Sequence, residues 1–128
     1  MQADIHGPQR KILTAEVRPA RAAHGTSGIA LKDGRTLPFV VIREWSAPEG
    51  YYAEQWFLVD PDTQEVLYEG PVEQALIWGL QSRTERRTEV TRQIPLEPGI
   101  YQVVFALGGL RGGDVDVQAA EAPAEEAA

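Results

Sequence analysis

The feature that most constrains the fold is the run of residues 100–107, which follows the turn sequence Leu96-Glu97-Pro98-Gly99. Tyr101, Val103, Phe105 and Leu107 fall on one face of a strand, because side chains alternate between faces with a period of two. Proline followed by glycine is strong turn punctuation. Residues 88–94 can form a polar strand that enters this turn. The stretch therefore predicts the closing hairpin of a β-sandwich or barrel.

Further strands are indicated along the rest of the chain. Asp33-Gly34 lies at the tip of a hairpin over residues 29–37, where a type I′ turn needs positive φ at both positions. Residues 37–45 are apolar on both faces, which favours a central strand. Residues 51–60 and 65–70 form two strands joined by a turn at Pro61, and residues 114–118 form a short final strand. The pattern predicts a mainly β, single-domain sandwich or partly open barrel of about seven to nine strands.

Residues 71–82 are ambiguous. Val72, Ala75, Leu76 and Leu80 fit the apolar stripe of a helix, and a proline suits the first helical position. As a strand, the segment would instead place Val72, Leu76, Trp78 and Leu80 on one face, interrupted by Gln74. We favour a short helix here.

The chain has 128 residues, of which 43% are hydrophobic, enough for one domain with a core. We expect a flexible N-terminal arm over 1–10, a β domain over 11–118 and a disordered acidic tail over 119–128. No apolar run reaches the roughly 18 residues of a membrane span, and no signal peptide is visible. These features predict a cytoplasmic protein.

Residue types that carry catalysis or hold metals are scarce. There is no cysteine, and no serine lies in a Gly-x-Ser-x-Gly elbow. His6 and His24 lie in loops with no identifiable partner. The Asp60-x-Asp62 turn lacks the glycine that a calcium loop needs at its sixth position, and no dinucleotide or phosphate-loop fingerprint occurs. We therefore expect no enzyme activity and no catalytic, cofactor-binding or metal-binding residues. An enzyme that uses a pair of the central carboxylates is a third hypothesis.

Charge is distributed in blocks. Residues 44–80 carry eight acidic and no basic side chains, whereas the segments on both sides are net basic. This pattern indicates either complementarity within the fold or a charged face for a partner. Arg83, Arg86, Arg87 and Arg92 form the one basic cluster, which would be the competing contact site. The net charge of −7 argues against nucleic acid as a partner.

Aromatic residues gather in the acidic block. Large rigid side chains dominate the binding energy of interfaces, and on a sheet they could form a platform. We therefore predict a small non-enzymatic protein-interaction module or accessory subunit, whose partner is another protein with a basic surface. The alternative is a ligand-binding module with an aromatic-lined site for a sugar, a peptide or an apolar ligand. The predicted contact residues are Trp45, Glu49, Tyr51, Tyr52, Glu54, Trp56 and Tyr68.

Overall fold

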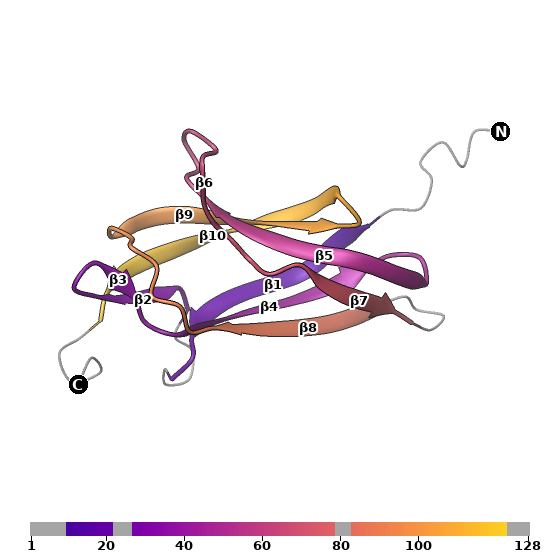
Figure 1. Cartoon of the computed structure of the whole chain (residues 1–128), viewed down its shortest axis with the longest axis horizontal. Coiled ribbons are helices and arrows are strands. Elements are labelled where there is room, and N and C mark those ends of the chain that lie inside the picture. Colours follow the sequence, from indigo (N-terminus) through magenta and orange to yellow (C-terminus); the bar gives the residue numbers. More distant parts are fainter. Residues whose placement is uncertain (1–9, 22–26, 79–82, 123–128) are drawn as a thin grey trace.

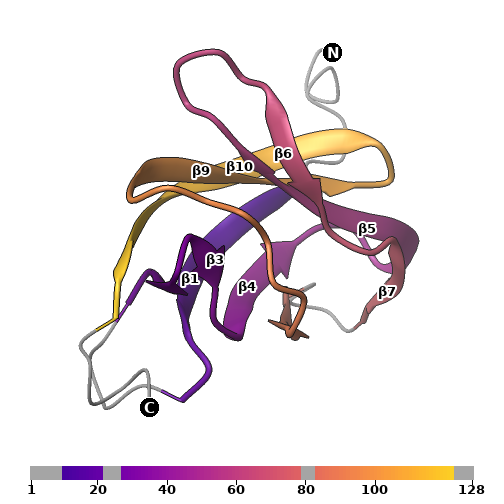
Figure 2. The same cartoon turned by 60° about the vertical axis from the view of Figure 1, so that its left-hand side comes forward.

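Strands with one apolar face must bury that face, and here they do so by packing two sheets against each other (Figures 1 and 2). The computed structural model describes residues 10–21, 27–78 and 83–122, and within them it has ten strands and no helix. The first sheet has the order β1 (Lys11–Pro19), β4 (Phe39–Ser46), β8 (Arg83–Val90). The second has the order β3 (Arg35–Thr36), β2 (Ile29–Lys32), β10 (Leu110–Glu121), β9 (Gly99–Leu107), β5 (Gly50–Val59), β6 (Val66–Glu69), and β7 (Glu73–Ile77) also pairs with β5.

Successive strands of the chain cross between the two sheets. The chain leaves the first sheet after β1, and β2 then pairs in parallel with β10 of the second sheet. β9 lies between β5 and β10. At the start of β9, the Tyr101 hydroxyl donates a hydrogen bond to the Glu97 carbonyl oxygen at 2.7 Å. This hydrogen bond holds the turn before β9 against the start of the strand.

The core lies between the two sheets. β4 contributes Phe39, Val41 and Trp45, and β9 contributes Val103, Phe105 and Leu107, each at most 1% exposed. Trp56 and Leu58 of β5 are buried among the same residues. Gly70 lies directly on the Trp56 ring, since a Cβ at this position would come within 2.6 Å of Trp56 Cε2. Inward and outward residues alternate along most of each strand, although Phe39, Val40 and Val41 at the start of β4 are all buried.

The predicted mainly β sandwich or partly open barrel is confirmed. The inward face of residues 101–107 is confirmed, and so is the hairpin at Asp33-Gly34, where φ is 55° and 76°. β4 is the central strand of the three-stranded sheet, as its apolar character indicated.

The helix predicted near 71–82 is wrong. Residues 73–77 form the strand β7, which pairs antiparallel with β5, and residues 79–82 lie outside the described residues. Ala75 and Ile77 point into the core, and Leu76 points out. A period of two therefore fits the observed burial, and the helical stripe was a coincidence of apolar spacing.

The closing hairpin predicted around Pro98-Gly99 is also wrong. β8 and β9 belong to different sheets, so the segment between them crosses from one sheet to the other. The hairpin of this region is instead β9–β10, and it turns at Gly108-Gly109 with φ of 60° and 82°. A turn sequence predicts a change of direction but does not tell which strand will be the partner.

The disordered tail was predicted to begin at residue 119, but the last strand extends beyond this residue. β10 continues through Glu121, and Ala119, Ala120 and Glu121 pair with β2. Ala119 is buried, because alanine fits where two strands lie against the core. Residues 123–128 of that tail and residues 1–9 of the predicted arm lie outside the described residues.

In the ranges that the structure covers, no helix has the length and apolar composition needed to cross a membrane.

Replacing Phe105 by alanine should destabilise the fold by about 3–5 kcal/mol, because its fully buried ring leaves a cavity between the sheets. Urea denaturation followed by tryptophan fluorescence measures this change. Ile100→Ala is the control on the same strand, since Ile100 is 54% exposed and should cost little. Equal midpoints for the two variants would show that the assigned faces of β9 are wrong.

Candidate functional site

The predicted contact residues do not share one surface. Trp45, Glu54 and Trp56 are at most 1% exposed and lie in the core, so they have no surface with which to contact a partner. β4 and β5 both turn this side inward, toward the other sheet. Glu49 and Tyr51 are exposed.

Tyr52 and Tyr68 are half-buried. The Tyr52 hydroxyl donates to the Pro48 carbonyl oxygen at 2.7 Å, and the Arg10 guanidinium carbon lies 4.9 Å from the centre of the Tyr52 ring. This cation–π contact, with the bond from Arg10 Nη1 to the Leu107 carbonyl oxygen at 3.1 Å, ties the start of the described chain to the second sheet. Whether these exposed and half-buried residues bind a partner stays a prediction.

Glu54 belongs instead to an ion pair inside the sandwich. Its carboxylate, on β5, faces the Arg43 guanidinium on β4, so the pair joins the two sheets. Arg43 Nε donates to Glu54 Oε2 at 2.7 Å, and Arg43 Nη2 donates to Oε1 at 2.6 Å. Both side chains are only 1% exposed. Such a two-pronged geometry suits the planar guanidinium and is among the stronger hydrogen-bonded pairs.

Neighbouring groups satisfy the rest of this buried charge. Trp45 Nε1 donates to Glu54 Oε2 at 2.6 Å, and Arg86 Nε of β8 donates to Oε1 at 2.7 Å. Arg86 Nη2 continues to Glu73 of β7 at 3.1 Å. Arg43 Nη1 donates to Thr88 Oγ1 at 2.8 Å and to a backbone carbonyl oxygen of its own strand. We call Arg43, Glu54, Arg86 and Glu73 the inter-sheet ion cluster; it links β4, β5, β7 and β8.

The surroundings keep Glu54 ionised. Burial by itself raises the pKa of its carboxyl group, but the hydrogen bond and charge of Arg43 oppose this, and the Trp45 N–H and the Arg86 charge add to the effect. Together these partners hold the pKa of Glu54 below its ordinary value of 4.5. A buried carboxylate with four donors has no accessible proton to give and no free oxygen to accept one. Glu54 is therefore a structural anion and not an acid or base.

The predicted arginine cluster is divided by the fold. Arg86 points inward to the inter-sheet ion cluster, Arg87 is exposed on the outer face of the first sheet, and Arg92 follows β8 at its end. The side chain of Arg83 lies outside the described residues. Strand alternation separates Arg86 from Arg87, although the sequence places them side by side.

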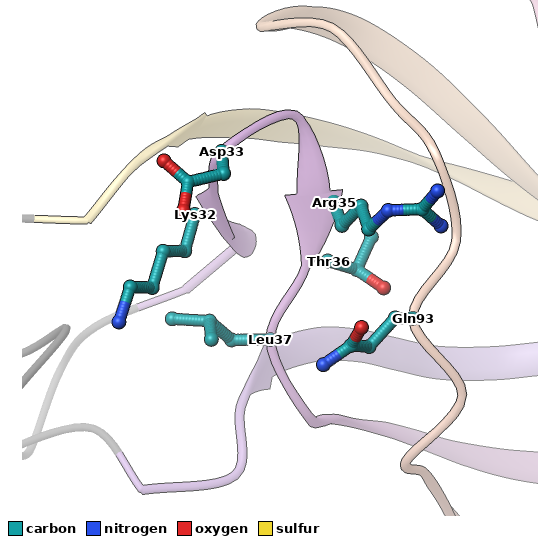
Figure 3. A pocket seen from close by; sticks show the side chains of 6 residues that line it. All are labelled: Lys32, Asp33, Arg35, Thr36, Leu37 and Gln93. Atoms are coloured by element: carbon teal, nitrogen blue, oxygen red, sulfur yellow. The ribbon is translucent and has the colours of Figure 1, made fainter.

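A groove lies at the end of the molecule near β3. It is about 470 Å³ in volume and runs between β6 and the crossover segment 92–95. We call it the β3–β6 groove, and its lining residues are Arg35, Leu67, Tyr68, Glu69, Arg92, Gln93, Ile94 and Pro95. A second hollow of about 260 Å³ adjoins it and shares Arg35 and Gln93 (Figure 3). In Figure 3 the Arg35 side chain extends toward the crossover segment, and Lys32 points away on the other side of the hairpin.

Thr36 fixes the position of the crossover segment. Its hydroxyl, in a residue only 1% exposed, accepts a hydrogen bond from the Ile94 N–H at 2.9 Å and donates to the Arg92 carbonyl oxygen at 3.2 Å. The Thr36 N–H donates to the Ile94 carbonyl oxygen at 3.0 Å, and the Leu96 N–H donates to the Gly34 carbonyl oxygen at 3.0 Å. The backbone that carries Arg92 is therefore held in register with the backbone that carries Arg35.

Arg35 and Arg92 keep their guanidinium groups available. Both residues are exposed, and neither forms an ion pair with any residue that the structure describes. Arg43 and Arg86, by contrast, are neutralised by carboxylates. Sequence reasoning missed Arg35 and Gln93, since neither stands in a motif. Only the crossover between the sheets brings residue 35 next to residues 92–95.

Metal ligands do not gather at this groove. The described ranges contain no group of three or more histidine, cysteine, aspartate or glutamate side chains that could hold a metal ion.

No protein-family model matches the chain, and no curated protein matches it. Among solved structures, it is similar to the Pseudomonas fluorescens alkylpurine DNA glycosylase AlkC bound to DNA containing an abasic site analog. The TM-score is 0.47 and the sequence identity is 18%, over 92% of this chain and 32% of that chain. This chain thus spans about a third of the length of the glycosylase chain.

This finding corrects two predictions made from the sequence. The first was a small non-enzymatic module that binds another protein, with a ligand-binding module that has an aromatic-lined site as its alternative. The second was that nucleic acid is not a partner. The similar protein is a DNA glycosylase and is bound to DNA, so neither prediction is kept. At this TM-score the similarity carries no argument that the present chain has glycosylase activity or binds DNA. The net charge on which the exclusion rested is a property of the whole chain, whereas binding depends on the charges at one surface.

The pKa of Glu54 predicts how stability depends on pH. Because this pKa is lower in the folded than in the unfolded chain, ionised Glu54 stabilises the fold above pH 4.5. This stabilisation is lost progressively as the pH falls from 4.5 toward the folded-state pKa. Glu54→Gln lacks the titration, so its urea midpoint should lie well below that of the parent at pH 7 and approach it below pH 4.5. A difference between the two midpoints that is constant down to pH 3 would contradict the assignment.

Proposed function

We propose that this domain binds a single strand of nucleic acid in the β3–β6 groove. The observation that carries the proposal is the pair of arginines, Arg35 and Arg92, which line one groove and have no carboxylate partner among the described residues. Guanidinium groups bind phosphate through two parallel hydrogen bonds, so two of them along a groove suit successive phosphates of a strand.

The remaining lining residues suit the other parts of a nucleotide. The Tyr68 ring is half-buried and packs against Trp56, with ring centres 5.7 Å apart, so it is held in place. An aromatic side chain in such a groove offers a stacking surface for a base, and stacking does not depend on sequence. Gln93 carries both a donor and an acceptor for the edge of a base.

The groove is organised before a ligand arrives. The hydrogen bonds of Thr36 and of the Gly34 carbonyl oxygen hold segment 92–96 on β3. Little ordering of the backbone is then needed on binding, which favours affinity.

The charge of the chain sets the expected strength of binding. Glu69 lines the groove with the two arginines, and the whole chain has a net charge of −7. Long-range repulsion therefore opposes the approach of a polyanion, and the local contacts must overcome it. We expect a dissociation constant of about 10⁻⁴–10⁻⁶ M at low salt, in the range of non-specific binding.

The Arg35→Glu, Arg92→Glu double variant should lose binding to a fluorescein-labelled 12-nucleotide strand, measured by anisotropy in 50 mM salt. The Arg35→Ala, Arg92→Ala double variant should keep weak binding. The slope of its log affinity against log salt concentration should be smaller than that of the parent by about 1.4, which is about 0.7 for each phosphate that an arginine no longer neutralises. Arg87→Glu is the matched control, because Arg87 is an exposed arginine on the outer face of the other sheet.

Two results would overturn this proposal. One is an equal loss of affinity in Arg87→Glu and Arg92→Glu, which would mean that only net charge matters. The other is no binding by the parent protein at 50 mM salt. A 12-base-pair duplex should bind more weakly than the strand, since its bases are not free to stack on Tyr68; tighter duplex binding would contradict the single-strand assignment.

Thr36→Val should weaken strand binding about tenfold, or ~1.4 kcal/mol, because it leaves the Ile94 N–H without its acceptor and frees the segment that carries Arg92. Thr36→Ser keeps the hydroxyl and should bind like the parent. Amide hydrogen exchange at Ile94 should accelerate in the valine variant only. Unchanged affinity in Thr36→Val, with faster exchange at Ile94, would show that the position of Arg92 does not matter for binding.

A further inference from the structure

Glu69 is a carboxylate that lines the same groove as the two arginines and pairs with neither of them. It lies on β6 and lines the β3–β6 groove together with Arg35 and Arg92. Its side chain is exposed and forms no ion pair or hydrogen bond with any residue in the described ranges. A groove for phosphate alone gains nothing from this carboxylate, because its charge repels a polyanion. The carboxylate therefore suits a part of the ligand other than the phosphates.

The main chain on both sides of the groove adds further hydrogen-bond acceptors. Within the described residues β6 pairs only with β5, so its other edge borders the groove. The Gly70 N–H donates to the Trp56 carbonyl oxygen at 2.8 Å, so the N–H and carbonyl oxygen of the preceding residue, Glu69, point to the free edge. On the opposite side, both neighbours of Pro95 bond to β3, so the Pro95 carbonyl oxygen points away from β3. Because proline has no N–H, acceptors outnumber donors among these main-chain groups.

Guanine is the base whose edge matches such acceptors. Its Watson–Crick edge has a ring N–H beside an amino group, and these two adjacent donors match the two oxygens of a carboxylate. Adenine and cytosine instead have a ring nitrogen acceptor beside their amino group, and thymine and uracil have a carbonyl oxygen on each side of their ring N–H. These acceptors would face the negatively charged oxygens and be repelled by them. A carboxylate that contacts this edge therefore favours guanine over the other common bases.

We propose that Glu69 makes the β3–β6 groove select guanine in the bound strand. The proposal rests on the proposed function and names the base that this groove prefers. The carboxylate accepts hydrogen bonds from the ring N–H and the amino group of guanine, while Arg35 and Arg92 bind the neighbouring phosphates. Gln93, on the crossover side of the groove, donates from its amide to the guanine carbonyl oxygen.

This contact requires an unpaired guanine. In a duplex the same edge of guanine is occupied by cytosine, so Glu69 only repels the phosphates of a duplex. The carboxylate thus lowers the affinity for duplexes and for strands without guanine, and it raises the affinity for single strands that contain guanine. These opposite effects on two ligands distinguish recognition of the base from simple repulsion.

Fluorescence anisotropy in 50 mM salt tests the proposal with three labelled 12-nucleotide strands. One contains only thymine, one alternates thymine and guanine, and one has inosine in place of each guanine. The parent protein should bind the guanine strand about tenfold tighter than the thymine strand. Inosine stacks as a purine but lacks the amino group, so most of this preference should be lost with the inosine strand.

The outcomes separate this proposal from the proposed function. Equal affinities of the parent protein for the thymine and guanine strands would overturn the selection of guanine and leave binding of a single strand standing. Equal affinities for the guanine and inosine strands would show that the preference comes from stacking, which also overturns the role of Glu69. No binding to any of the strands would refute the proposed function and this proposal together.

Glu69→Met separates base recognition from charge. Removal of a negative charge beside the arginines should raise the affinity for the thymine strand, whereas the affinity for the guanine strand should fall until the two are nearly equal. Glu85→Met is the matched control, because Glu85 is an exposed carboxylate on the first sheet, and it should keep the preference of the parent. Thermal unfolding of both variants checks that they fold. A rise in affinity by the same factor for both strands in Glu69→Met would show that the carboxylate acts only through its charge, and would overturn the proposal.

Discussion

The ion pair between Arg43 and Glu54 is the interaction on which the relative position of the two sheets depends. Two charges inside a sandwich are costly to remove from water, and the cost is offset only when every polar atom finds a partner. Here the carboxylate takes hydrogen bonds from Arg43, Trp45 and Arg86, and Arg86 continues to Glu73. Because the partners come from β4, β5, β7 and β8, the network fixes the register of four strands at once. Apolar packing alone tolerates small shifts, whereas these short, directional bonds do not.

The crossover between the two sheets also forms the candidate site, the β3–β6 groove. Where the chain crosses from β8 to β9, segment 92–96 lies against β3 and is held there by Thr36. The crossover brings Arg92 beside Arg35, and within the described part of the chain neither has a carboxylate partner such as those that neutralise Arg43 and Arg86. The fold therefore uses two arginines for stability inside the sandwich, while Arg35 and Arg92 line the β3–β6 groove with exposed side chains.

Local patterns in the sequence predicted the strand faces and turns, which depend on residues close together in the chain. The alternation at Tyr101, Val103 and Phe105 gave the buried face of β9, and Asp33-Gly34 gave a turn with positive φ. Partners of strands were not predictable in this way. The turn at Pro98-Gly99 joins two sheets and not two paired strands, and the apolar spacing over 71–82 fitted a helix as well as the strand that formed. Glu54 and Trp56 looked like a solvated acidic and aromatic surface, because the sequence does not show that Arg43 lies opposite Glu54. The groove at Arg35 is equally invisible, since its two sides are far apart in the sequence.

A double-mutant cycle on Arg43→Met and Glu54→Leu tests the central claim most directly. Arg43→Met leaves Glu54 with only Arg86 and Trp45 as partners, and Glu54→Leu leaves the buried Arg43 guanidinium without a carboxylate. Each single substitution should lower the free energy of unfolding by about 3–5 kcal/mol. The double variant leaves Arg86 paired with Glu73 and should be destabilised by at least ~2 kcal/mol less than the sum of the two single effects. Single effects that add to within about 0.5 kcal/mol would show that the two charges are not coupled, and that packing alone holds the sheets together.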